Sequence, residues 1–247
     1  MNKRTKTIQG VPNLSKSGDP QGNDMTENDE EKAEVLANFF SSVFTIEKDG
    51  NWSLPEGPVR HNGLVNINES AVLNILGKIN KTKSPGPDGI HPRVLWEARE
   101  QLSLPLCIMF NSSICTQSLP DDWLHANVSA IHKKGNKTVA SNYRPISLTS
   151  VVCKVIETLV RDSLMSHMTS NNILSSKQFG FISGRSTLLQ LLHVMDKWTT
   201  TLDQGGQVDV VFCDFAKFFV KVPHRRLMAN SDIMGFRTHY LAGLIAF

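Results

Sequence analysis

The spacing of apolar and polar residues predicts a chain made mostly of helices. Apolar residues recur every three or four positions, as on one face of a helix, in five segments. These segments run from Thr26 or Asn28 to about residue 44, from about Asn68 to residue 79, and over residues 92–118, 150–168 and 186–198. Asn or Thr before the first two segments can accept a hydrogen bond from a free backbone N–H, which favours helix starts there.

Strand patterns are fewer and scattered. Alternating or β-branched residues favour strands in "NVSAIH", in "SNYRPISL" and in "QVDVVFCDF". Helices interspersed with so few strands indicate an α+β architecture. The strands are too few to close a sheet of ordinary size, which predicts an incomplete domain.

Composition divides the chain into four segments. Residues 1–25 are rich in Gly, Pro, Asn, Ser and Lys and predict a poorly ordered lead-in. A helical segment, residues 26–82, follows and ends in the lysine-rich, proline-interrupted stretch "GKINKTKSPGPDGI". The boundaries of the remaining two segments, residues 83–200 and 201–247, are set by that stretch and by a Gly-Gly turn.

Charge is unevenly distributed along the 247 residues, although the net charge is only +3. Residues 26–34 carry five acids and one Lys, whereas residues 125–161 carry six Lys or Arg and one Glu. A basic segment of this kind suits phosphates, and a solvated face explains it as well. Four cysteines without a C-x-x-C pair, no long apolar run and no secretion signal predict an intracellular protein, nuclear or cytoplasmic, with no membrane partner.

The strand and turn "HKKGNKTVASNYRPISL" offer the first candidate chemistry. Lys133 and Lys134 follow one strand, and Arg144 lies about one hairpin away. Two facing strands would bring these cations together, an arrangement that suits a triphosphate. A solvent-exposed hairpin accounts for the same residues.

Two further stretches have a candidate role. Gly180 and Gly184 in "KQFGFISGRSTLLQLL" allow close approach to the backbone, and Arg185 precedes a helix start that favours anions. A plain turn and helix cap fit equally well. Asp214 ends the third predicted strand, where a carboxylate either binds metal or simply caps an exposed strand end.

Taken in order, five blocks of the chain resemble the reverse transcriptase region of non-LTR, LINE-type retrotransposons, in particular the jockey-like group. The blocks are "EEKAEVLANFFSSVFT", "KSPGPDGIHPRVL", "AIHKKGNKTVASNYRPISLTSVVCKVIE", "SSKQFGFISGRST" and "VDVVFCDFAKFFVKVPHRRL". The resemblance implies a right-hand polymerase fold of which this chain holds the fingers, residues 83–200, and the start of the palm, residues 201–247. The last block is similar to polymerase motif A.

The resemblance also implies roles for individual residues. Asp214 and the backbone carbonyl of Phe215 would bind Mg²⁺, and Phe219 would be the steric gate against the sugar. Lys133, Lys134 and Arg144 would face the incoming deoxynucleoside triphosphate. Template contacts would come from Lys83, Gly184 and Arg185. The implied partners are an RNA template and a DNA primer, and the implied reaction is two-metal nucleotidyl transfer.

The chain departs from the family pattern in two ways. Phe218 and Val220 stand where the family usually has a small residue and an Asp. A Tyr-Ala-Asp-Asp turn, the thumb and the endonuclease domain of the parent protein are missing, so we expect the isolated chain to be inactive. Two alternatives remain open: a non-catalytic module that binds RNA or a primer–template, and a decayed transposon-derived chain without function.

Overall fold

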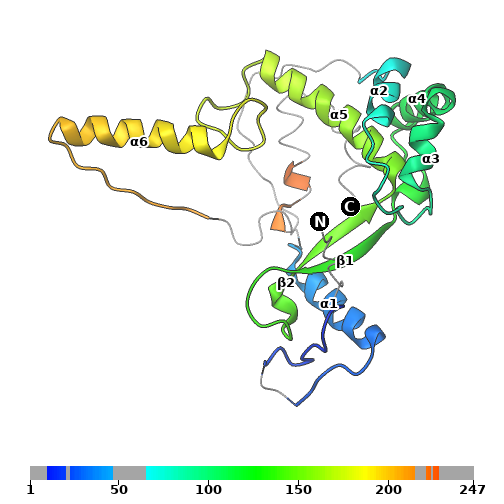
Figure 1. Cartoon of the computed structure of the whole chain (residues 1–247), viewed down its shortest axis with the longest axis horizontal. Helices are drawn as coiled ribbons and strands as arrows, with labels where there is room; N and C mark the ends of the chain where they lie inside the picture. Colours follow the sequence, from blue (N-terminus) through cyan, green and yellow to red (C-terminus); the bar gives the residue numbers. More distant parts are fainter. Residues whose placement is uncertain (1–9, 21–22, 47–64, 215–220, 224, 228–247) are drawn as a thin grey trace, which may run out of the picture. The chain divides into compact units, whose positions relative to one another are not determined.

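The structure, a computed structural model, describes residues 10–20, 23–46, 65–214, 221–223 and 225–227. It confirms the α+β class at a coarse level, because several helices accompany one small antiparallel sheet in this part of the chain (Figure 1). In chain order the elements are α1 (Asp29–Val43), α2 (Glu69–Gly77), α3 (Pro92–Glu97), α4 (Arg99–Thr116), the 3₁₀ turn η1 (Asp121–Trp123), β1 (Ala126–His132), the 3₁₀ turn η2 (Ala140–Asn142), β2 (Tyr143–Thr149), α5 (Val151–Ser170) and α6 (Thr187–Asp203).

The chain divides into two compact units. The hairpin unit comprises Met1–Arg161 and Phe219–Phe247, and the α6 unit comprises Asp162–Phe218. The predicted division into a lead-in, a helical segment, fingers and palm follows other boundaries and stays a prediction.

Side-chain caps explain where three of the helices begin. The Asn28 side chain accepts a hydrogen bond from Glu31 N at 2.8 Å, and the Asn68 side chain accepts one from Ala71 N at 2.8 Å. Ser186 does the same for α6, where Leu189 N donates to its hydroxyl at 3.2 Å. Each cap satisfies an N–H that has no partner within its helix, so these starts are encoded locally.

The α1 cap also carries an ion pair. The Glu31 carboxylate accepts a hydrogen bond from Glu27 N and pairs with Lys16 Nζ at 3.0 Å. The backbone donor first, and Lys16 second, lower the pKa of Glu31, while the hydrogen bond to Glu31 raises the pKa of Lys16. The lead-in is therefore tied to the first turn of α1.

The single helix predicted over residues 92–118 is two helices, which corrects the periodicity argument. α3 ends at Glu97 and α4 begins at Arg99, with Ala98 between them at φ −93° and ψ 16°. Pro105 lies inside α4 without ending it. One local and one tertiary hydrogen bond hold the break. Arg99 Nη1 donates to Trp96 O at 3.0 Å, and Trp96 Nε1 donates to Gly77 O of α2 at 3.1 Å.

A first core lies between α1, η2 and one face of the sheet. Its buried members are Leu14, Leu36, Phe40, Ala140 and Tyr143, with Ala130 of β1 packed against them. Leu14 is fully buried, and Leu14 N donates to the buried Thr26 hydroxyl at 2.8 Å. The sequence carries no signal for this burial, because a single leucine has no periodic pattern yet fills a core site.

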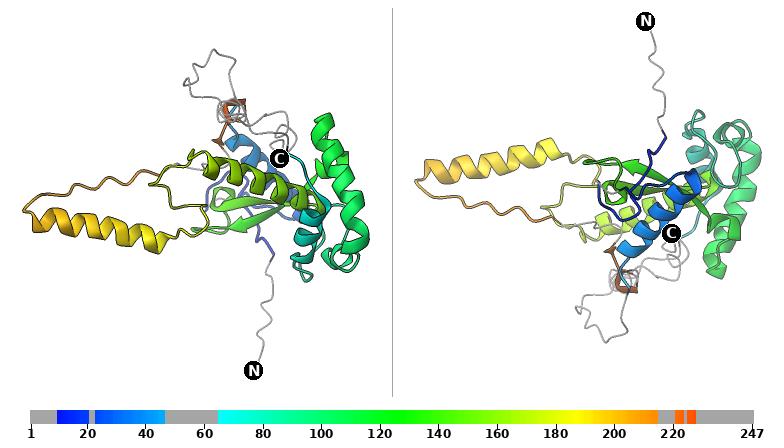
Figure 2. Two further views of the ribbon diagram at one scale, coloured as in Figure 1. Left: turned by 90° about the horizontal axis from the view of Figure 1, so that it is seen from above. Right: turned by 90° about the horizontal axis from the view of Figure 1, so that it is seen from below.

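A second core lies between α2 and α4, which are neighbours in both views of Figure 2. Val72, Leu76 and Phe110 are fully buried there, and the Phe110 ring lies 5.6 Å from that of Trp123. Polar contacts fix the register of the two helices. Asn111 exchanges two hydrogen bonds with the backbone of Ile67, and the Ser103 hydroxyl donates to Glu69 at 2.8 Å.

The third predicted strand, "QVDVVFCDF", does not form in the described residues up to Asp214. Residues 206–214 have no regular secondary structure, and Val211 and Phe212 are largely exposed. A strand is stabilised by pairing with another strand, and the described part of the α6 unit contains none. No helix in the described part of the chain is long and apolar enough to cross a bilayer.

Candidate nucleic-acid interface

The β1–β2 hairpin brings two predicted cations onto one face. Ile131 pairs with Arg144 and His132 with Tyr143, and Lys133 N extends the ladder by donating to Asn142 O at 2.8 Å. Side chains alternate along a strand, so Lys133 and Arg144 share the face opposite buried Tyr143. Their Cα atoms are diagonal neighbours, about 7–8 Å apart. Both side chains are exposed and long enough to reach one anion.

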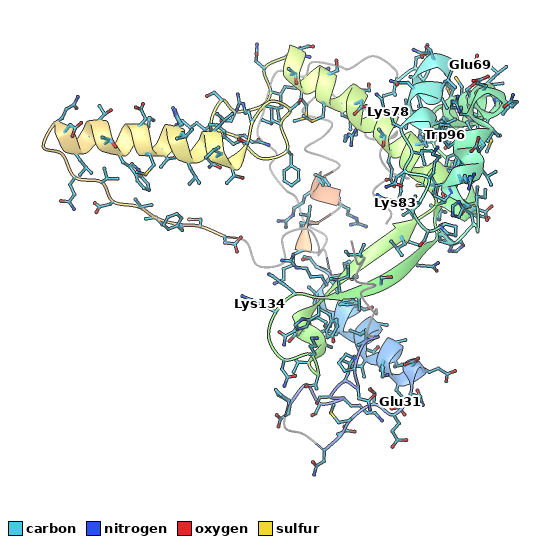
Figure 3. All side chains as sticks on the ribbon, in the orientation of Figure 1. Glu31, Glu69, Lys78, Lys83, Trp96 and Lys134 are labelled. Atoms are coloured by element: carbon cyan, nitrogen blue, oxygen red, sulfur yellow. The ribbon has the colours of Figure 1, made fainter. Side chains whose placement is uncertain are left out.

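The loop that carries the remaining lysines is held by several hydrogen bonds. The Tyr143 hydroxyl donates to Lys137 O at 2.7 Å, and the Asn142 side chain donates to Asn136 O at 2.8 Å. Ser15 N of the lead-in donates to Thr138 O at 2.8 Å. Burial raises the pKa of Tyr143, so its hydroxyl stays a donor throughout the physiological range. Lys134 and Lys137 therefore project from an ordered backbone, with Lys134 at the loop end of the hairpin (Figure 3).

Lys83 lies at the other end of the hairpin. Its loop is anchored at Gly86, where an added Cβ would lie 2.6 Å from Ser150 Cα and 2.8 Å from Thr149 O. Thr149 pairs with Ala126 at the start of β1, whereas Lys133 follows the end of β1. Glycine is needed at position 86 because two backbones pack closely there, and not because of an unusual dihedral angle.

An aromatic–cation cluster beside Lys83 was missed by the sequence analysis. Lys81 Nζ lies 3.6 Å from the centroid of the Trp96 ring, and the Arg99 guanidinium carbon lies 4.5 Å from it. The three-residue spacing of Trp96 and Arg99 is a signal that could have been read from the sequence, since such residues are neighbours on a helical surface. The contact between Lys81 and Trp96 could not have been read from the sequence, because it joins a loop to a separate helix.

Arg185 has a structural role within the α6 unit. Its Nη1 donates to the backbone carbonyls of Ser176 (2.9 Å), Ser175 (3.4 Å) and Gln178, and its guanidinium lies 5.6 Å from the Phe179 ring. Arg185 thus organises the loop before α6. Gly184 beside it has φ +77° and open space around its Cα. A template contact of either residue stays a prediction.

Asp214 is exposed and lies in the irregular segment that follows α6. Within the described residues no group of three or more His, Cys, Asp or Glu side chains could hold a metal ion. Phe215 and Phe219, with the departures Phe218 and Val220, lie outside the described residues.

The predicted site residues thus separate into two sets. Lys83, Lys133, Lys134 and Arg144 belong to the hairpin unit, and Gly184, Arg185 and Asp214 belong to the α6 unit. Within the hairpin unit, the structure brings Lys133 and Arg144 onto one face and leaves Lys83 at the far end of the strands.

Known proteins match this chain over most of its length. Residues 131–246, a little under half of the chain, match the family model described as reverse transcriptase (RNA-dependent DNA polymerase). The chain is 29% identical over 226 residues to the probable RNA-directed DNA polymerase from transposon BS of Drosophila melanogaster, covering 85% of this chain and 24% of that protein. It is 31% identical over 154 residues to the corresponding protein of the X-element, covering 62% and 17%.

A third relative belongs to the group suggested by the motifs. The RNA-directed DNA polymerase from mobile element jockey of Drosophila melanogaster is 26% identical over 215 residues, which covers 80% of this chain and 23% of that protein. The chain spans about a quarter or less of the length of the curated relatives it matches.

Proposed function

We propose that the chain supplies the fingers and the start of the palm of an RNA-directed DNA polymerase, because residues 131–246 match the reverse transcriptase family model and the chain is similar to polymerases of non-LTR transposons. The reaction of the whole enzyme would be the copying of an RNA template into DNA from a primer. The observation that carries the proposal is the pair of exposed cations, Lys133 and Arg144, on one face of an ordered hairpin inside the matched segment.

This hairpin suits the triphosphate of an incoming deoxynucleotide. Arg144 can hold two phosphate oxygens with its planar guanidinium, and Lys133 and Lys134 add compact positive charges. None of the three pairs with an acidic side chain in the described residues. Phe219 would exclude a ribose hydroxyl, and Lys83, Gly184 and Arg185 would lie along the template. These roles rest on the resemblance of the motifs.

Divalent metal ions serve this family, and Mg²⁺ is the ion we propose. Bound ions would activate the primer hydroxyl and stabilise the leaving pyrophosphate. Asp214, with the Phe215 carbonyl, would be one part of such a site. The described residues hold no group of three or more His, Cys, Asp or Glu side chains that could bind a metal ion with it, and the 247 residues contain no Tyr-x-Asp-Asp sequence. One carboxylate holds a largely hydrated Mg²⁺ weakly, so this chain by itself does not fit a two-metal site.

We therefore expect no polymerase activity from the 247-residue chain alone. The test is primer extension on an RNA template with all four deoxynucleotides and Mg²⁺, comparing the chain with its Asp214→Asn variant. The expected result is no extension by either protein. Extension that disappears in the Asp214→Asn variant would overturn this expectation and show that Asp214 acts in catalysis.

The nucleotide site has a separate test that needs no catalysis. We expect the variant Lys133→Gln/Arg144→Gln to bind a fluorescent deoxynucleoside triphosphate at least tenfold more weakly than the unmodified chain, because charge-assisted hydrogen bonds of about 1.5–3 kcal/mol each are lost. The matched control is Lys177→Gln/Lys197→Gln, two exposed lysines of the α6 unit. Equal triphosphate binding by both variants would show that the hairpin is not part of the nucleotide site.

A second candidate function is non-catalytic binding of RNA or a primer–template. Within the described residues, the hairpin-loop lysines pair with no acidic side chain and no metal-binding group of three or more side chains includes Asp214, and both observations favour it. Binding that weakens steeply with salt, without extension in the first test, would support this function over catalysis. Aggregation without any salt-dependent binding would instead indicate a decayed chain.

A further inference from the structure

The turn after α2 carries a compact set of lysines that the polymerase roles above do not use in full. Residues 77–83, "GKINKTK", hold Lys78, Lys81 and Lys83 and no acidic residue. All three side chains are exposed, and no acidic side chain pairs with them in the part of the chain that the structure describes. We call Lys78, Lys81, Lys83 and Trp96 the Trp96 patch, of which Figure 3 labels Lys78, Lys83 and Trp96.

Helix-end electrostatics explain only part of this arrangement. Cations near a helix C-terminus are stabilised by the helix dipole, and Lys78 is the C-cap of α2. That effect falls off beyond the last turn. Lys81 and Lys83 lie past the cap, so their positions need another explanation.

Trp96 fixes the position of one of these cations. Its indole N–H donates to Gly77 O at 3.1 Å, which joins α3 to the end of α2, and Lys81 Nζ lies 3.6 Å from the ring centroid. A lysine held over an aromatic ring loses part of its rotational freedom before a ligand arrives, and its ammonium protons remain available. By contrast, Arg93 and Arg99 are paired with Glu97 and Glu100.

From these contacts we propose that the Trp96 patch is a second phosphate-binding surface, which grips the sugar–phosphate backbone of the same nucleic acid strand that the hairpin contacts. This inference rests on the second candidate function above, the binding of RNA or a primer–template by the hairpin, and it takes the hairpin cations as the first surface. With Lys81 held over the ring, Trp96 positions cations rather than stacking on a base. The contact is therefore independent of base sequence.

The separation of the two surfaces supports a single strand as the partner. Gly86 contacts Ser150 beside the Thr149–Ala126 end of the hairpin, and Lys133 follows the opposite end. Seven paired residues of about 3.4 Å each place these ends roughly 20 Å apart. Phosphates of one strand in a helical stack repeat every ~3.4 Å along the axis, so about six stacked nucleotides would connect the two surfaces. An acidic protein has no such regular spacing to match.

The test is fluorescence anisotropy with a 20-nucleotide unstructured RNA and a 4-nucleotide RNA, using the full chain at several salt concentrations. Each lysine–phosphate contact to a single strand contributes about 0.7 to the slope of log affinity against log salt. The variant Lys81→Gln/Lys83→Gln should therefore lose about 1.4 from the slope and bind the 20-nucleotide RNA about 25-fold more weakly at 0.1 M salt. The affinity of this variant for the 4-nucleotide RNA should fall only about twofold, because the short RNA can still bind the hairpin.

Two sets of variants distinguish placement of the cations from mere charge or folding. Lys177→Gln/Lys197→Gln removes the same charge elsewhere and should leave binding of the 20-nucleotide RNA within about twofold. Trp96→Phe keeps an aromatic ring under Lys81 and should retain most of the affinity for the 20-nucleotide RNA. Trp96→Leu removes the ring and should lose that affinity, while its circular dichroism spectrum stays unchanged.

The outcomes separate the inference from the proposed function. Unchanged binding by Lys81→Gln/Lys83→Gln, with weakened binding by Lys133→Gln/Lys134→Gln, would overturn the second surface and leave the hairpin site intact. No salt-dependent binding by the unmodified chain would count against both. Competition by polyglutamate as effective as that of RNA, at equal charge, would overturn the assignment to nucleic acid.

Discussion

Two similar helices, one in the hairpin unit and one in the α6 unit, differ in how much of their apolar face is buried. α1 and α6 both start at a side-chain cap and both carry an apolar stripe. α1 buries Leu36 and Phe40 in a core with Tyr143, whereas α6 has no buried residue and its Leu188 is 66% exposed. Amphipathic spacing thus predicts a helix in both units, but burial that stabilises the helix depends on what packs against it.

The two units also differ in where buried apolar side chains are found among the described residues. They lie between Leu14 and Val160, within the hairpin unit, while Val211 and Phe212 of the α6 unit are more than 80% exposed. Because burying a large apolar side chain contributes about 1.5–3 kcal/mol, the hairpin unit should account for most of the free energy of unfolding.

Truncating one apolar side chain in each unit gives the largest expected effect. Phe110 is fully buried against Trp123, so Phe110→Ala should lower the free energy of unfolding by about 3–5 kcal/mol. The Leu192 side chain on α6 is 58% exposed, so Leu192→Ala should lower the free energy of unfolding by less than about 1 kcal/mol. Urea unfolding followed by circular dichroism measures both. Similar losses of unfolding free energy in the two variants would contradict the proposed difference in stability between the units.

A smaller effect is expected where two backbones meet within the hairpin unit. Gly86→Ala places a Cβ 2.6 Å from Ser150 Cα, and backbone atoms cannot move aside as a flexible side chain can. The expected loss is about 1–3 kcal/mol in the same urea experiment. Gly77→Ala is the matched control, since no atom lies within 4 Å of its Cβ position. If both variants unfold at the same urea concentration, the loop is not anchored at Gly86.

Cysteine labelling compares the buried core of the hairpin unit with exposed sites in both units, without altering their stability. Cys153 is fully buried, burial raises its pKa to about 12, and its thiol donates to Glu157 at 3.3 Å. Thiolates are the reactive form, so iodoacetamide at pH 8 should modify exposed Cys115 and Cys213 at least a hundredfold faster than Cys153. Mass spectrometry of labelled peptides follows each site. Rapid labelling of Cys153 in the folded chain would show that this core opens.

The sign of the pH dependence at Cys153 follows from the raised pKa. The folded state holds the thiol proton up to a pKa of about 12, whereas an unfolded thiol releases it near its ordinary pKa of 9.0. The stability linked to this proton is therefore fully present below pH 9 and is lost as the pH rises from 9 towards 12. Labelling of Cys153 should accelerate over the same interval.

The sequence by itself determined the features that a few neighbouring residues encode. Asn28, Asn68 and Ser186 cap helices through hydrogen bonds that span three residues, so their positions could be read directly. The hairpin and the grouping of Lys133 with Arg144 followed from two short strand patterns. The order of the motifs led to a resemblance to reverse transcriptases of non-LTR elements, and the comparisons find the same similarity.

Only the tertiary structure decided which residues distant in sequence meet. It buried Leu14, set Gly86 against Ser150, placed Lys81 over Trp96 and directed Arg185 to its own loop. It also left Asp214 outside any strand in the described residues. The physical reason is that caps and periodicity depend on local geometry, whereas these contacts arise when separate elements exclude water from a shared core and fix the loops between them.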